Sequence, residues 1–158
     1  MIILSSPQFR EGDLIPTCYT GEGQNLSPPL RWSGLPKNTK QLALICEDPD
    51  APGPESWVHW VIYGINPETT SQIPEGISQK AQLRQPIEAK QGINSWGSLG
   101  YGGPLPPRGH GAHRYFFKLI LLNQALELPS GLTKAQLLKS IEPHRLAEIQ
   151  FMGRFERK

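Results

Sequence analysis

The sequence has few cysteines, little net charge and no long apolar run, and each shortage excludes a class of protein. Its two cysteines, Cys18 and Cys46, are too few for a disulfide-built scaffold and are expected to be free thiols. The formal net charge is only +2 and no run of lysines or arginines occurs, so a nucleic-acid-binding surface is not expected. The longest aliphatic run is Leu119–Leu122, whereas a helix that crosses a bilayer needs about 20 apolar residues.

The N-terminal sequence also lacks the features of a secretory leader. MIILSSPQF has no basic segment and only a short apolar stretch. Together with the lack of a membrane-spanning apolar run, this predicts a cytoplasmic protein. The length of 158 residues and the absence of repeats or linkers predict a single domain over 1–158.

Apolar and β-branched segments alternate with glycine- and proline-rich ones. The predicted strands cover residues 2–4, 41–47, 57–65, 113–123 and 146–155. The 16 glycines and 16 prolines gather between them, so residues 5–40 and 66–112 are expected to be mostly turns and loops. Cys46 lies in the apolar segment QLALICE and is expected in the core.

One helix is predicted late in the chain. Thr133 is a good N-cap, Gln136 completes a capping box, and Leu137 and Ile141 give an apolar face that ends before Pro143. Strong strands with one late helix predict a mainly β fold, a sandwich of two antiparallel sheets with one or two short peripheral helices. An α+β fold with one larger sheet is the alternative.

The segment DPDAP follows the predicted strand 41–47 and could hold two carboxylates at its end. Its prolines restrict the backbone, so that Asp48 and Asp50 would be held rigidly. An Asx-type turn that merely closes the strand would use the same residues, and DPDAP in isolation is more typical of such a turn. In the next strand, alternation predicts that Trp57, His59 and Val61 share a face.

A second polar segment is the loop 100–111, which leads into His113-Arg114-Tyr115. Its glycines allow close backbone approach, but its prolines donate no hydrogen bonds and GxxxxGK[ST] is absent, so a rigid rim is expected. His113 and Tyr115 are two residues apart and are predicted to face the same way, with Arg114 on the opposite face. An ordinary loop before a core strand is the alternative.

Three motifs together resemble the signature of the phosphatidylethanolamine-binding protein family, which includes the Raf kinase inhibitor proteins. They are DPDAP, HWVIYGI and GYGGPLPPRGHGAHRY, and IPTCYTGEGQNLSPPLRWSGLP is similar to the bacterial and archaeal branch. The resemblance covers nearly the whole chain. It implies a β-sandwich with a small anion pocket at one end.

The resemblance also implies which residues line that pocket. The aspartate, two histidines and tyrosine of the motifs correspond to Asp48, His59, His113 and Tyr115. The remaining expected ligand-binding residues are Trp57, Ala51, Pro52, Gly102, Gly103, Pro106 and Pro107. Relatives bind phosphate, acetate, phosphoryl-ethanolamine or similar anions. Some inhibit kinases or serine proteases, and microbial ones often form homodimers.

Two features depart from the family pattern. Many microbial relatives carry a cysteine where this chain has Gly21, and Cys18 could be a displaced substitute. The chain also ends at Lys158 without the C-terminal helix of the mammalian members, so their lipid and kinase interactions are less expected here.

The pocket is expected to bind an anion without catalysis, and no cofactor or metal is expected. His59 and His113 could donate ring N–H groups and Tyr115 its hydroxyl. Asp48 would orient an imidazole, receive the ammonium of an ethanolamine group, or be protonated itself.

Two other functions compete with this interpretation. One is a protein-interaction or inhibitor module whose pocket is only regulatory. The other is a metal-assisted hydrolase built on the HxxH of His110 and His113. His110 lies in a glycine-flanked loop without an obvious cysteine or glutamate partner, and the serine-hydrolase motif GxSxG is absent.

Overall fold

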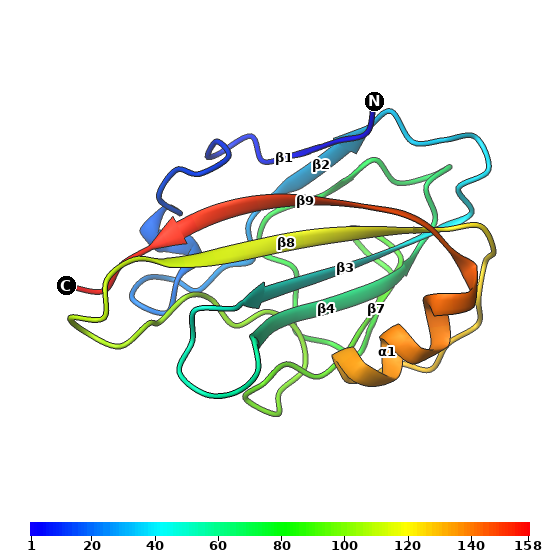
Figure 1. Ribbon diagram of the computed structural model, residues 1–158. Helices are drawn as coiled ribbons and strands as arrows, with labels where there is room; N and C mark the ends of the chain where they lie inside the picture. Colours follow the sequence, from blue (N-terminus) through cyan, green and yellow to red (C-terminus); the bar gives the residue numbers. More distant parts are fainter.

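The computed structural model describes residues 1–158 as two antiparallel sheets and one α-helix (Figure 1). The small sheet has the order β1-β2-β5 and the large sheet the order β6-β7-β4-β3-β8-β9. The strands are β1 Ile3–Ser5, β2 Leu30–Ser33, β3 Gln41–Asp48, β4 Trp57–Ile65, β5 Gln72–Ile73, β6 Gln82–Leu83, β7 Ala89–Gln91, β8 His113–Leu122 and β9 Arg145–Phe155. The helices are α1 Lys134–Ile141 and the 3₁₀ turns η1 Thr17–Tyr19 and η2 Glu142–His144.

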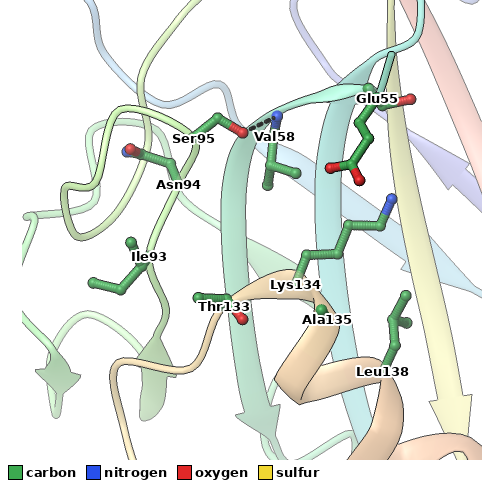
Figure 2. A pocket seen from close by; sticks show the side chains of 10 residues that line it. Glu55, Val58, Ile93, Asn94, Ser95, Thr133, Lys134, Ala135 and Leu138 are labelled. Carbon is green, nitrogen blue, oxygen red and sulfur yellow. Dashed lines mark hydrogen bonds between the residues drawn. The ribbon is translucent and has the colours of Figure 1, made fainter.

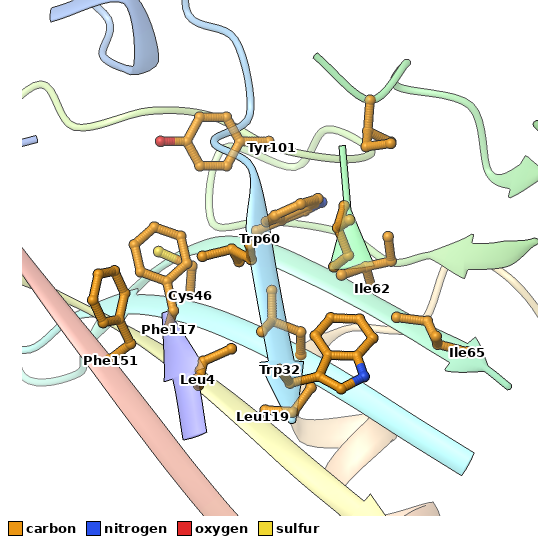
Figure 3. Close-up of a cluster of buried hydrophobic side chains, with 14 of the residues drawn as sticks. Leu4, Trp32, Cys46, Trp60, Ile62, Ile65, Tyr101, Phe117, Leu119 and Phe151 are labelled. Carbon is orange, nitrogen blue, oxygen red and sulfur yellow. The ribbon is translucent and has the colours of Figure 1, made fainter. Parts of the chain in front are cut away.

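The main core lies between the two sheets. Every residue of β3 is buried, and its side chains alternate between two apolar clusters. Leu44 and Cys46 face the cluster that includes Trp32 of the small sheet (Figure 3), whereas Ala43 and Ile45 face α1 on the other side. A strand between two cores is apolar at every position, which is why QLALICE shows no polar alternation.

The helix covers the far face of the large sheet. The Thr133 side chain accepts from the Gln136 backbone N–H, and the Gln136 side chain accepts from the Thr133 N–H, which completes the expected capping box. Lys134 Nζ lies 2.5 Å from Oε1 of buried Glu47, which ties the first helical turn to β3. No helix of this protein is both long and apolar enough to span a membrane.

The two-sheet architecture and the late helix are confirmed, and the five expected strands lie within one residue of their predicted ends. The single-sheet alternative is wrong. Four short strands were not expected: β2 lies within the predicted loop region 5–40, and β5, β6 and β7 lie within 66–112. Strands of two to four residues are too short to show a recognisable alternation of apolar and polar side chains. Their extended conformation depends on pairing with the neighbouring strands.

The expectation that Val61 shares a face with Trp57 and His59 is wrong because β4 contains a bulge at His59. Cys46 pairs with Trp60 and Glu47 with Val58, which leaves His59 as one extra residue. Beyond the bulge the alternation is reset, so Trp60 enters the main core and Val61 faces α1. β-Bulges re-aim side chains and are frequent beside functional sites.

Candidate functional site

Strand order brings residues far apart in the sequence to one end of the large sheet. β3 lies between β4 and β8 and is antiparallel to both, so its last residues lie beside the first residues of each neighbour. Asp48 ends β3 and pairs with Trp57 at the start of β4. On the other side Glu47 pairs with Phe116, near the start of β8, which His113 begins.

A cavity of about 290 Å³ opens at this end of the sheet. It is lined by Asp48, Ala51, Pro52, Trp57, His59, Trp96, Leu105, Pro106, Pro107, His113 and Tyr115. Among the expected pocket residues, only Gly102 and Gly103 lie elsewhere, in a neighbouring hollow that shares Trp96 and Leu105 with the cavity. No lysine or arginine lines the cavity.

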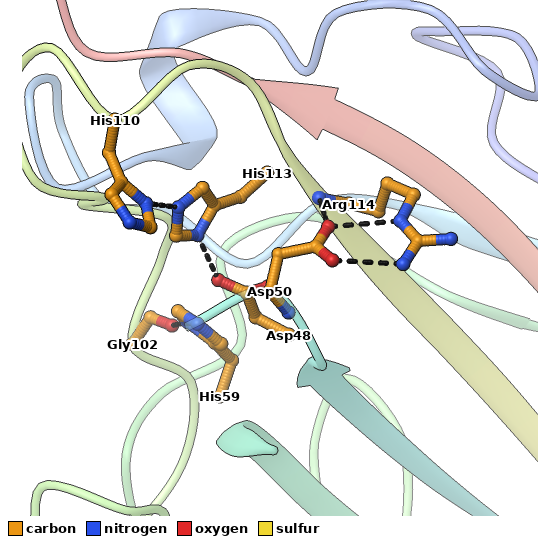
Figure 4. Close-up of polar contacts among 7 residues, drawn as sticks. All are labelled: Asp48, Asp50, His59, Gly102, His110, His113 and Arg114. Carbon is orange, nitrogen blue, oxygen red and sulfur yellow. Dashed lines mark hydrogen bonds and ion pairs between the residues drawn. The ribbon is translucent and has the colours of Figure 1, made fainter. Parts of the chain in front are cut away.

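Asp48 positions other groups and has no oxygen left unpaired. Its Oδ2 accepts a hydrogen bond of 2.6 Å from His113 Nδ1, and its Oδ1 accepts one of 2.7 Å from the Asp50 backbone N–H (Figure 4). The side chains of Asp48 and His113 are 3% and 2% exposed, so this is a buried pair. The carboxylate fixes Nδ1 as an N–H and leaves Nε2 as the only other polar atom of the His113 ring.

The other nitrogen of His113 is engaged by His110. His113 Nε2 lies 2.5 Å from His110 Nδ1, and one of the two nitrogens must donate (Figure 4). His110 is exposed and lies between Gly109 and Gly111, which have φ values of 74° and 82°. Those left-handed conformations need glycine, so the loop is shaped to carry His110 over His113. No three His, Cys, Asp or Glu side chains are grouped so that they could hold a metal ion.

The second aspartate of DPDAP points away from the cavity. Asp50 accepts from Arg114 Nε and Nη2, both at 2.9 Å, and from the Arg114 backbone N–H. These hydrogen bonds lower the pKa of Asp50 to about 2. Arg114 is exposed while His113 and Tyr115 are buried, so the predicted facing of these three residues is confirmed.

His59 is held by the loop that follows β7. Its Nδ1 lies 2.6 Å from the Gly102 carbonyl oxygen, and the Gly102 N–H donates to the His59 carbonyl at 2.9 Å. Burial lowers the pKa of His59 to about 4, although the Gly102 carbonyl and the charge of Asp48 act in the opposite direction. At neutral pH the ring is therefore uncharged and its one N–H is used by Gly102. In that state the ring has no second N–H to offer, and the expectation that His59 donates to a bound anion stays a prediction.

Tyr115 provides the free donor of the cavity. Its ring is buried and lies edge-on to His59, with centroids 5.1 Å apart. Its hydroxyl makes no hydrogen bond to another residue, yet it is not among the polar atoms sealed from solvent, so it opens into the cavity. Burial and the charge of Asp48 raise the pKa of Tyr115, which keeps the hydroxyl protonated.

Sequence reasoning missed Trp96, which forms a wall of the cavity. Its ring is 46% exposed and packs edge-on against Trp57 and His59, with centroids 5.5 and 5.0 Å away. Buried Asn94 shapes this turn, because its Oδ1 accepts from the N–H groups of Trp96 and Ser98. The sequence offers one signal for Trp96, which is a large aromatic side chain within the turn sequence NSWGS. Turn formation itself does not need an aromatic residue there.

A larger hollow of about 580 Å³ lies beside α1, but it offers less chemistry (Figure 2). Lys134 is bound by Glu47, and Ser95 Oγ accepts from the Val58 N–H. The Thr133 hydroxyl caps the helix. These three side chains are thus satisfied within the protein, in contrast to the hydroxyl of Tyr115.

Fold and cavity define a two-sheet β protein with a pocket at the end of its large sheet, in which apolar walls surround a few polar side chains. The family profile described as Phosphatidylethanolamine-binding protein matches residues 5–156. A protein of Methanothermobacter thermautotrophicus, named only as a UPF0098 protein, is 44% identical over 154 residues, which cover 98% of each chain. This chain belongs to the phosphatidylethanolamine-binding protein family.

Two solved structures share the fold closely. The homologue from Chlamydia trachomatis is 37% identical with a TM-score of 0.88, over 99% of this chain and 98% of that one. The Escherichia coli family member YbcL is 31% identical with a TM-score of 0.89, over 99% of both chains. A carboxypeptidase Y inhibitor, solved in complex with its proteinase, is only 17% identical with a TM-score of 0.54 and shows the fold alone.

Proposed function

We propose that this protein binds a small oxyanion, such as a phosphomonoester, in the cavity lined by Asp48, His59, His113 and Tyr115, without catalysing a reaction. The observation that carries the proposal is the unpartnered hydroxyl of Tyr115, which opens into the same cavity as a buried Asp48–His113 pair. Phosphate, phosphoryl-ethanolamine and related head groups have this chemistry.

His113 supplies the second donor in this proposal. Asp48 holds its Nδ1–H, so a bound anion would accept from Nε2–H, and the doubly protonated ring would offset the charge of the carboxylate.

Tyr115→Phe tests the proposal directly. The change removes one donor and keeps the ring that packs on His59, and hydrogen bonds to charged groups contribute about 1.5–3 kcal/mol. We expect phosphate affinity, measured by calorimetry, to fall about 10- to 100-fold. Tyr63→Phe is the matched control, because that hydroxyl bonds to the Pro129 carbonyl on the other face of the sheet. Equal affinities for the two variants would count against the proposal.

His110 competes with the ligand in this scheme, because it occupies the His113 nitrogen that an anion needs. His110→Ala is therefore expected to raise phosphate affinity about three- to tenfold, the equivalent of one ordinary hydrogen bond. His144→Ala, in η2, should leave affinity unchanged. A loss of affinity in His110→Ala would mean instead that His110 contacts the anion.

Regulation of a protein partner is the second candidate function. Trp96 and Leu105 are 46% and 44% exposed at the rim of the cavity, and an apolar rim suits contact with another protein. Three expectations stay predictions: that this partner is a kinase or serine protease, that the protein forms a homodimer, and that it is cytoplasmic. A relative in Mycobacterium tuberculosis, 37% identical over 98% of this chain and 72% of its own length, carries a name that describes a lipoprotein.

A further inference from the structure

The hydrogen bonds of His59 determine which of its nitrogens carries a proton. A carbonyl oxygen can only accept, so the 2.6 Å contact with the Gly102 carbonyl requires the hydrogen to be on Nδ1. The reciprocal bond from the Gly102 N–H to the His59 carbonyl holds the loop in place. Because the buried ring is neutral, Nε2 is a lone pair.

That lone pair belongs to the cavity. The Gly103 backbone also acts on the ring and raises its pKa, but Nε2 makes no hydrogen bond to another residue. It is not among the side-chain atoms that are both sealed from solvent and unpaired, which are Trp32 Nε1, Thr39 Oγ1 and Arg157 Nε. The ionisable side chains that face His59 are Asp48 from β3 and His113 and Tyr115 from β8, while Trp57 and Trp96 add aromatic walls. No lysine or arginine lines the cavity to change this polarity.

The cavity therefore presents donors at one side and an acceptor at the other. We infer that, among tetrahedral oxyanions, the site selects those that carry a hydrogen of their own, such as phosphate or a phosphomonoester as the monoanion, over those that carry none, such as sulfate. The ligand O–H donates to His59 Nε2, and the ligand's charged oxygens accept from Tyr115 and His113. This selectivity rests on the proposed anion-binding function and narrows it to one ligand class.

Sulfate is rejected because it has only acceptors to offer. One of its oxygens would face the lone pair of His59 within the cavity, so two acceptors would repel each other and neither would receive a hydrogen bond from the other. Sites built to hydrogen-bond a ligand hydroxyl discriminate strongly against analogues that lack it, because their buried polar groups are then unsatisfied. We expect discrimination of at least about 100-fold.

Four probes test this by calorimetry at about pH 6, where phosphomonoesters still carry a hydrogen in part. Inorganic phosphate and methyl phosphate should bind, and sulfate and dimethyl phosphate, which lack the hydrogen, should bind at least about 100-fold more weakly. Equal affinities for phosphate and sulfate would overturn the selectivity and leave the proposed function standing. No binding of phosphate would overturn both.

His59→Gln gives an independent readout, because an amide can turn either its acceptor or its donor toward the ligand. In this variant, the affinity for phosphate should exceed the affinity for sulfate by less than about tenfold. Arg114→Gln alters a side chain outside the cavity and should keep the wild-type ratio of the two affinities. An unchanged ratio in folded His59→Gln would overturn the role of His59. The wild-type anion series stands on its own if that variant does not fold.

Discussion

His113→Ala is expected to abolish measurable phosphate binding and to lower the free energy of unfolding by about 3–5 kcal/mol. The variant removes the imidazole that donates to Asp48 at 2.6 Å and leaves that carboxylate buried without this hydrogen bond. Breaking a buried pair costs more than the pair itself contributes, because the remaining charge stays desolvated. Calorimetry with phosphate and chemical denaturation measure the two effects.

Arg114→Ala is the neighbouring control. Its guanidinium binds Asp50 at the surface, outside the cavity, so phosphate affinity should be unchanged and stability little affected. Asp48→Asn with His113 intact should cost less stability than His113→Ala, since an amide oxygen still accepts from Nδ1. Comparable losses of binding in His113→Ala and Arg114→Ala would refute the facing of these residues on β8.

Acid destabilisation between about pH 6.5 and pH 4 is the second large effect, and it is assigned to His59. The ordinary pKa of 6.5 applies to the unfolded chain, whereas burial holds the folded value at about 4. Within that window the unfolded chain binds a proton that the folded protein does not, so stability falls as the pH falls. The accumulated loss from this residue is about 3 kcal/mol and should be complete near pH 4.

Urea denaturation at a series of pH values measures this loss in wild type and in His59→Gln. The variant should lack the part of the pH dependence that falls between about pH 6.5 and 4. Asp50 does not contribute to the pH dependence in this range. Its pKa is lowered from 3.8 to about 2, so the stability that it provides is lost only as the pH falls below about 3.8. Parallel pH profiles for the two proteins would contradict a neutral, buried His59.

The long strands could be predicted because their residues favour the extended conformation and also fill the core. β4 was predicted with its observed ends, since WVHWVIYGI is aromatic and β-branched throughout. β2 was missed because only four residues pair there, between prolines and a glycine, and the pairing depends on β1 and β5. The prediction from alternation that Val61 faces the same way as His59 also failed. A bulge arises from the pairing of two strands and cannot be recognised in the sequence of one strand alone.

The gathering of Asp48, His59, His113 and Tyr115 could be expected from the motifs, and the strand order explains it. The roles of single atoms could not. From the sequence alone, both histidines are expected to donate to a ligand. The nitrogen that is left for a ligand depends on which partner holds the other one, and that partner is Asp48 for His113 and the Gly102 carbonyl for His59. Trp96 was missed for a similar reason, since its place in the wall follows from the folding of a distant loop.

The most direct test of oxyanion binding is imidazole ¹⁵N NMR of the wild-type protein during titration with inorganic phosphate at about pH 6. The four histidines report separately, and His144 serves as an internal reference because it lies in η2, away from the cavity. We predict saturable shifts of the Nε2 signals of His113 and His59 with no change at His144. Unchanged signals for both cavity histidines at saturating phosphate would contradict the account.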